Sequence, residues 1–313
     1  MRTEHDRPWP ELPPKGRYAR LTDRLSTWRN QRLLRAASRL LILAIALILV
    51  LTVVLFVSRT YSLDSATYPG TVQRLDVDAG TGEVAVVGSD RSNVFVLWQR
   101  RYSLIKPQVQ RQMRGGTLQL RSRCPRMSLR CAVILGSQVP ERIAVSIRAR
   151  SAPTTAQNLS GPLDVMTLSG EVTVQQIAAP VRVDTAAGKV TLNDLHGDLV
   201  AKTISAPIQL YDIRGQIRLI SKSGSITGVG WVTPALDAQT ATGWVTAEFG
   251  APPGRIDIRS VSGQVTLSMP AGHYRLDLEA PAGAIRVTGI VDDPTSARTI
   301  KISTGGGIFL TGR

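Results

Sequence analysis

Histidine and cysteine are both scarce in this sequence. The 313 residues include three histidines, His5, His196 and His273, which lie far apart along the chain. A histidine-based metal site needs several such ligands close together, so we expect neither a metal site nor a cofactor. The chain also has no Gly-x-Ser-x-Gly elbow, and residues 305–307, a glycine triplet, lack the Lys-Ser/Thr that completes a phosphate loop. These absences favour a protein that is not an enzyme.

Aromatic residues are also few, at 5% of the chain, whereas valine, isoleucine, leucine, threonine and glycine are plentiful. This mixture favours strands and tight turns over a helical core. The net charge of +15 is uneven: residues 1–39 and 91–150 carry the excess of arginine and lysine, and residues 151–313 are balanced. The basic character therefore belongs to two segments and not to the whole chain.

Residues 40–57 form the longest apolar run and contain no charge, glycine or proline. As a helix this run spans about 27 Å, enough for the hydrocarbon core of a bilayer. A cleaved signal peptide is the alternative, but the 39 preceding residues are too long for an ordinary leader and no small-x-small cleavage site follows. We therefore expect an uncleaved transmembrane helix.

The segments beside this run define the expected topology of a single-pass membrane protein. The basic, proline-containing residues 1–39, with an amphipathic segment near their end, are expected in the cytoplasm, where they are a candidate contact for a partner protein. Residues 58–313 are expected to lie outside the cytoplasm, and the first of them, residues 58–70, to form a linker. Nucleic-acid binding is therefore not expected. The basic residues 91–150 favour anionic lipid or cell-wall polymer, or form a solvated face.

Between residues 163 and 231 the sequence repeats every eighteen residues. Small residues open each alternating run, and one apolar column contains Val172, Val190, Ile208 and Ile226. A fixed period of this size predicts a repeat architecture in which successive units stack. We expect an all-β solenoid with 18–20-residue repeats over residues 151–313, preceded by a basic β region over residues 71–150. A β-sandwich is the alternative, but it has no reason to keep eighteen-residue columns.

Glycine recurs at the start of the alternating runs, as at Gly170, Gly188 and Gly224, with Ala206 in the same column. Because glycine readily adopts a positive φ, we expect these residues to form turns in that conformation.

Three phrases of the chain resemble a known family. They are Leu-Asp-Val-Asp-Ala-Gly-Thr-Gly-Glu-Val-Ala-Val at residues 75–86, Thr-Leu-Ser-Gly-Glu-Val-Thr-Val at residues 167–174 and Ser-Val-Ser-Gly-Gln-Val-Thr-Leu at residues 260–267. Over residues 70–313 the chain resembles bacterial "putative adhesin" domains of unknown function, which are often tethered by one transmembrane helix. The resemblance implies a β-solenoid outside the membrane and an adhesive or envelope role, and it supplies no catalytic motif.

The two cysteines, Cys124 and Cys131, are separated by six residues. Outside the cytoplasm, an even pair at this spacing predicts a disulfide that closes a hairpin or loop. A loop of this length stabilises the fold by about 2–3 kcal/mol.

Two polar columns of the repeat are candidate sites. Asp194 and Asp212 lie one period apart, and His196 and Arg214 follow each by two residues. Such a group is suited to a cation, or to acid–base chemistry on a sugar. The alternative is a turn in which each aspartate bonds its own backbone.

The second column is expected to face outward as a polar ladder that docks polysaccharide or another ordered polymer. The same residues are also ordinary exposed strand residues with favourable cross-strand pairing. The ladder contains Thr173, Thr191, Gln209, Thr227, Thr246 and Thr266.

Taken together, the sequence favours a non-enzymatic membrane protein that displays a β-solenoid as an adhesin or as a structural or binding module of the cell envelope. Its expected partners are the lipid bilayer and an anionic wall polymer or polysaccharide. Two alternatives stay open. One is an accessory of envelope-stress signalling that acts through residues 1–39, and the other is a carbohydrate-active β-helix enzyme.

Overall fold

The computed structural model describes residues 37–53, 60–103, 105–125 and 131–313, in two compact units, Met1–Ser58 and Arg59–Arg313. In the first unit, residues 37–53 form a helix whose side chains are all exposed. Among the described residues no helix is both long and apolar enough to cross a membrane. The expected cytoplasmic segment up to residue 36 and the end of the apolar run, residues 54–57, lie outside the described residues.

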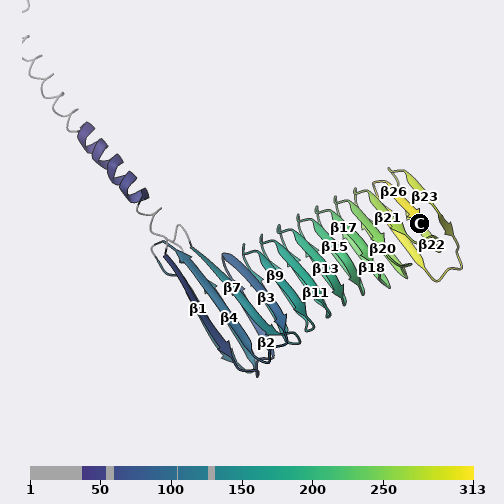
Figure 1. Cartoon of the computed structure of the whole chain (residues 1–313). Helices are drawn as coiled ribbons and strands as arrows, with labels where there is room; N and C mark the ends of the chain where they lie inside the picture. Colours follow the sequence, from purple (N-terminus) through teal and green to yellow (C-terminus); the bar gives the residue numbers. More distant parts are fainter. Residues whose placement is uncertain (1–36, 54–59, 104, 126–130) are drawn as a thin grey trace, which may run out of the picture. The chain divides into compact units, whose positions relative to one another are not determined.

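The second unit is all-β, and its described strands form two sheets of thirteen, which stack strand upon strand along the unit (Figure 1). Sheet A contains, in spatial order, β1 (Thr60–Tyr68), β4 (Val94–Tyr102), β7 (Cys131–Pro140), β3 (Gly82–Ser89), β9 (Thr154–Leu159), β11 (Val172–Ile177), β13 (Val190–His196), β15 (Ile208–Arg214), β17 (Ile226–Trp231), β19 (Val245–Phe249), β21 (Val265–Met269), β26 (Ile308–Gly312) and β23 (Ile285–Thr288). Sheet B contains β24 (Ile290–Asp292), β22 (Gly272–Glu279), β25 (Thr299–Thr304), β20 (Arg255–Ser260), β18 (Ala235–Thr240), β16 (Ile217–Ser221), β14 (Leu199–Thr203), β12 (Val181–Thr185), β10 (Leu163–Thr167), β8 (Ala144–Ala149), β2 (Arg74–Ala79), β6 (Thr117–Arg123) and β5 (Gln108–Arg114).

The eighteen-residue period is the step from one rung of the coil to the next. In sheet A, Val172 pairs with Val190, Val190 with Ile208, and Ile208 with Ile226, all in parallel strands. These four side chains are fully buried between the sheets, because alternate residues of each strand point inward. The predicted solenoid is confirmed. Parallel neighbours one period apart exclude the alternative of an antiparallel sandwich.

The reason for the repeated glycine differs from the one expected. Gly170, Gly188 and Gly224 do not have a positive φ. They lie so close to the preceding rung that a Cβ on Gly188 would approach the carbonyl oxygen of Gly170 to 1.8 Å. The expectation of a positive φ is therefore wrong, and close backbone approach explains the column.

The two ends of the coil depart from sequential stacking. Thr60–Tyr68, expected as part of a linker, instead form β1, which pairs antiparallel with β4. The basic region over residues 71–150 shares both sheets with the repeats, since β3 pairs with β9 and β8 pairs with β10. At the other end, β25 and β26 insert between the rung of β20 and β21 and the rung of β22 and β23.

A column of buried hydroxyl groups closes the turns that follow six neighbouring strands of sheet B, from β10 to β20. The Thr185 hydroxyl accepts a hydrogen bond from the N–H of Gly188 at 3.1 Å, and the Thr203 hydroxyl accepts one from Ala206 at 2.9 Å. The same bond, from the N–H three residues later, recurs at Thr167, Ser221, Thr240 and Ser260. These side chains satisfy N–H groups that the close approach of rungs removes from water.

Replacing Thr185 by valine should lower the free energy of unfolding by about 1–3 kcal/mol, because the Gly188 N–H is left buried without an acceptor. Urea denaturation measures the change. Thr191→Val is the matched control, since Thr191 is an outward residue of β13, and should cost less than about 0.5 kcal/mol. Equal losses in the two variants would contradict a role for the buried hydroxyl.

Candidate functional site

The outer face of sheet A carries no charge along two neighbouring rows that cross five consecutive rungs. At these two outward positions of β9, β11, β13, β15 and β17 only hydroxyl, amide, phenol and aliphatic side chains occur. The charged residues of β13 and β15, Asp194, Asp212 and Arg214, lie beyond these rows, toward the ends of their strands. We call the two uncharged rows the neutral face. It consists of Thr155, Gln157, Thr173, Gln175, Thr191, Asn193, Gln209, Tyr211, Thr227 and Val229.

The predicted polar ladder is the central row of this face. Thr173 lies beside Thr191, and Gln209 lies between Thr191 and Thr227. The row continues through Thr246 to Thr266 on β19 and β21. Strand spacing sets a repeat of about 4.8 Å between neighbouring groups. The ladder's geometry is as expected, and the docking of a polymer on it stays a prediction.

The outer face of sheet B is charged. On β10, β12, β14, β16, β18 and β20, two outward rows run across all six strands, and eight of their twelve residues are ionic. We call this surface the charged face. It consists of Asp164, Met166, Arg182, Asp184, Val200, Lys202, Arg218, Ile220, Asp237, Gln239, Asp257 and Arg259.

Ion pairs neutralise much of the charged face. Arg182 lies 2.8 Å from Asp184, and Arg259 lies 3.1 Å from Asp257. The hydrogen bond to Asp184 raises the pKa of Arg182 above its ordinary value. Both arginines are more than half exposed, so solvent screens these pairs and they add little stability. Their main effect is to give this face an ionic character that the neutral face lacks.

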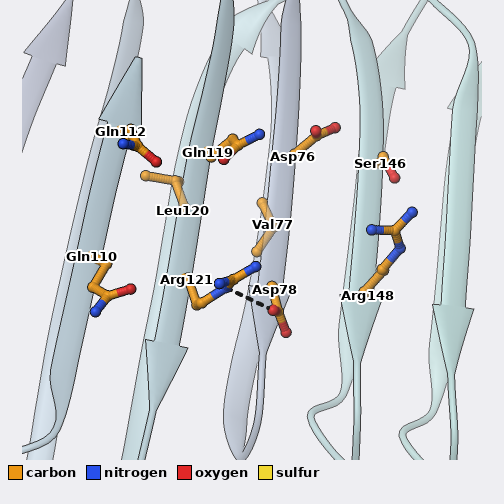
Figure 2. Close-up of a pocket in the computed structure, with 10 residues that line it drawn as sticks. All are labelled: Asp76, Val77, Asp78, Gln110, Gln112, Gln119, Leu120, Arg121, Ser146 and Arg148. Atoms are coloured by element: carbon orange, nitrogen blue, oxygen red, sulfur yellow. Dashed lines mark ion pairs between the residues drawn. The ribbon is translucent and has the colours of Figure 1, made fainter. Parts of the chain in front are cut away.

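A polar pocket lies beside the charged face, on strands β5, β6, β2 and β8 (Figure 2). Its volume is about 110 Å³, too small for most organic ligands. Asp78 is paired with Arg121 at 2.9 Å, and Asp76 with Arg74 at 2.8 Å, so neither carboxylate is a free base. The pocket can offer hydrogen bonds to a small polar group. Its lining consists of Asp76, Val77, Asp78, Gln110, Gln112, Gln119, Leu120, Arg121, Ser146 and Arg148.

The predicted aspartate pair occupies a special backbone position. Asp194 and Asp212 have φ values of 56° and 53°, and the same left-handed conformation occurs every eighteen residues at Asn158, Gln176 and Gly230. Aspartate, asparagine and glycine are the residues that tolerate this conformation best. The left-handed backbone therefore favours aspartate at both positions, but these residues lie within β13 and β15 and not in the turns that the alternative expected.

The side chains around this pair are exposed. His196 Nε2 lies 3.3 Å from Asp194 Oδ1, and both side chains are about half exposed. His196 is paired with Arg214 across β13 and β15, as the period predicted. Among the described residues, no group of three or more histidine, cysteine, aspartate or glutamate side chains is placed to hold a metal ion. A cation or acid–base role for this group stays a prediction.

The predicted disulfide is confirmed. Cys124 and Cys131 are bonded, with their Cα atoms 5.8 Å apart, and connect the end of β6 to the start of β7. The Thr81 hydroxyl donates a hydrogen bond to the Cys131 carbonyl oxygen at 3.1 Å, which ties this end to the next rung.

Sequence reasoning missed two features of the site. The neutral face depends on Gln157, Gln175 and Asn193 as much as on the threonines, and it is visible only when both outward rows are placed side by side. The spacing of the aspartates indicated part of the column of residues with a left-handed backbone. Gln176 gave no such indication, because glutamine seldom adopts this conformation.

The family model described as Toastrack DUF4097 matches residues 72–301 of this chain. A comparison with curated proteins finds no match. The chain is similar to a solved "putative adhesin" from Parabacteroides merdae, with 11% identity over 80% of this chain and 96% of that chain, and a TM-score of 0.35. It is also similar to a "putative cell adhesion protein" from Clostridium sporogenes, with 12% identity over 82% and 100% of the chains and a TM-score of 0.24. A "putative lipid binding protein" from Parabacteroides distasonis gives 11% identity, 81% and 95% coverage and a TM-score of 0.43. Likenesses at these scores carry no functional argument.

Replacing Asp194 by valine should lower the free energy of unfolding by about 1–2 kcal/mol, because a β-branched residue is strained at this left-handed position. Asp194→Gly should be neutral or stabilising, and urea denaturation measures both. Asn193→Val, one residue earlier at an ordinary strand position, is the control and should change stability little. A loss with glycine as large as that with valine would show that the carboxylate itself matters.

Proposed function

We propose that this chain, which belongs to the Toastrack DUF4097 family, is a membrane-anchored, non-enzymatic binding module whose neutral face docks a hydroxyl-rich, uncharged polymer of the cell envelope or of another cell surface. The observation that carries the proposal is that two neighbouring outward rows of sheet A carry no charge, whereas the charged face of sheet B is mostly ionic. A coil needs only its inward columns to fold, so the absence of charge from ten neighbouring outward positions is not required by stacking.

The chemistry of the neutral face suits a polysaccharide. Hydroxyl and amide groups can exchange hydrogen bonds with sugar hydroxyls, and no ion has to lose its hydration shell when the polymer docks. The regular repeat of rungs offers the same groups again and again along the coil, so a polymer can make many weak contacts together. An anionic wall polymer fits this face less well, because no cation lies on it.

The proposed anchor is the apolar run at residues 40–57. Its described part is helical, and large side chains such as Leu40, Leu47 and Leu51 are more than half exposed, as expected for groups that contact lipid. The arginine-rich residues 1–39 favour a cytoplasmic N-terminus. The disulfide at Cys124 and Cys131 favours an oxidising compartment for the solenoid.

The absence of a catalytic role is part of the proposal. The left-handed backbone at Asp194 and Asp212 is a structural reason for aspartate at these positions. The carboxylates of the polar pocket are paired with arginine. An enzyme that used the aspartate pair would lose its activity in the double variant Asp194→Asn, Asp212→Asn.

Gln209→Glu tests the docking surface with almost no change in shape, because it places one carboxylate in the middle of the neutral face. Binding to an uncharged polysaccharide should weaken about tenfold, since the new charge must be desolvated without a partner. Co-sedimentation of the full chain with a panel of insoluble neutral and anionic polysaccharides measures the effect.

Gln239→Glu is the matched control, because Gln239 is an outward residue of the charged face, beside Arg259. It should leave binding unchanged. Binding that is lost equally in both variants, or only in the control, would reject the neutral face as the docking surface. Retention only by anionic polymers would reject the proposed ligand class.

A further inference from the structure

A second pocket lies at the end of sheet A where β1 begins, β4 ends and β7 begins. In this register Tyr61 lies opposite Arg101, and Tyr102 lies opposite both Thr60 and Cys131. The pocket has a volume of about 370 Å³ and is wider and more apolar than the polar pocket of Figure 2. Its lining consists of Thr60, Tyr61, Arg101, Tyr102, Ser103, Cys131 and Ala132.

The surface around this pocket combines apolar groups with cations. Tyr61 is 57% exposed, Leu63 is 65% exposed and Ile105 is 46% exposed. Arg101 and Lys106 are exposed as well. The ion pairs of the described residues give neither of these cations a carboxylate partner, and Arg101 donates only to the Gln99 side chain at 3.3 Å.

Acidic residues are nearly absent from this end. Residues 91–140 contain none. Asp64 of β1 is paired with Arg100, which leaves Glu83 at the start of β3 as the nearby carboxylate on a neighbouring rung. Positive charge beside exposed tyrosine and aliphatic groups is the composition that sits at the interface of an anionic bilayer.

Only a short stretch of sequence connects this end to the apolar run. Residue 53 and Thr60 are seven residues apart, a stretch that spans at most about 25 Å when fully extended. If the apolar run is the membrane anchor, the strand ends that line the pocket lie within reach of the headgroup layer. The opposite end of the solenoid, at β23, has no such constraint.

We propose that this pocket binds the headgroup of an anionic phospholipid in the bilayer that holds the anchor. Arg101 contacts the phosphate, Tyr61 and Tyr102 enclose the glycerol region, and Lys106 meets a neighbouring headgroup. This inference rests on the membrane anchor of the proposed function, but not on the polymer ligand. Its consequence is a solenoid held in a fixed orientation at its base.

Hydrogen exchange of the full chain in lipid nanodiscs tests the proposal. In discs of phosphatidylcholine with a quarter phosphatidylglycerol, backbone amides of residues 60–63 and 101–106 should exchange about fivefold or more slowly than in discs of phosphatidylcholine alone. About 0.5 M salt should remove most of the difference, because it screens exposed charges. Arg101→Gln should abolish the protection and Arg101→Lys should retain part of it.

Arg286→Gln, on β23 at the other end of the coil, is the control and should behave as the parent chain does. Equal exchange in the two kinds of disc would overturn the proposal, and so would equal protection by free glycerol 3-phosphate in discs of phosphatidylcholine alone, since the ligand would then not be lipid. Failure of the chain to enter discs at all would overturn the anchor itself and this inference with it.

Discussion

Parallel strands stacked in register are the constraint from which the rest of this structure follows. Each strand bonds its backbone to the rung before and the rung after, so a residue has the same neighbours one period away on both sides. The inward columns must then be apolar along the whole coil, as at Val172 and Val190, and the turns must bring backbones together closely enough to exclude a Cβ. Only the outward rows are free of this demand, so their residue types are not dictated by stacking.

The eighteen-residue period predicted the coil, its inward columns and the order of its rungs, because apolar residues one period apart occupy equivalent positions on successive rungs. The disulfide followed from two cysteines at close spacing. The ends could not be predicted in this way. Insertion of β25 and β26 beside β20 and β21, and the pairing of β1 with β4, depend on contacts between segments that share no period. The buried hydroxyl column, as at Thr185, was hidden because threonine is also an ordinary exposed strand residue.

The candidate site was predicted only in part. The threonine ladder emerged from the period, but the contrast between the neutral and charged faces required knowing which residues of both sheets point outward. Aspartate spacing drew attention to Asp194 and Asp212, whereas the φ values at Asn158 and Gln176 show that the left-handed backbone recurs in this column with other residues too. Two surfaces exceed what stacking requires. The neutral face lies along the repeats, and the basic, tyrosine-lined pocket lies at the start of β1. We propose that the first binds a polymer and that the second binds a lipid headgroup.

Removal of one period tests the account most directly. Deleting residues 174–191, eighteen in all, joins Thr173 to Leu192 and keeps every inward and outward position, whereas deleting residues 174–190 joins two outward threonines and shifts the alternation by one. Urea denaturation followed by circular dichroism should show cooperative unfolding of the first variant at nearly the parent stability, since each rung contacts only its neighbours. The second variant should lose several kcal/mol or fail to fold, because inward and outward side chains exchange places or a bulge must form. Equal stability of the two variants would contradict the claim that register holds this protein together.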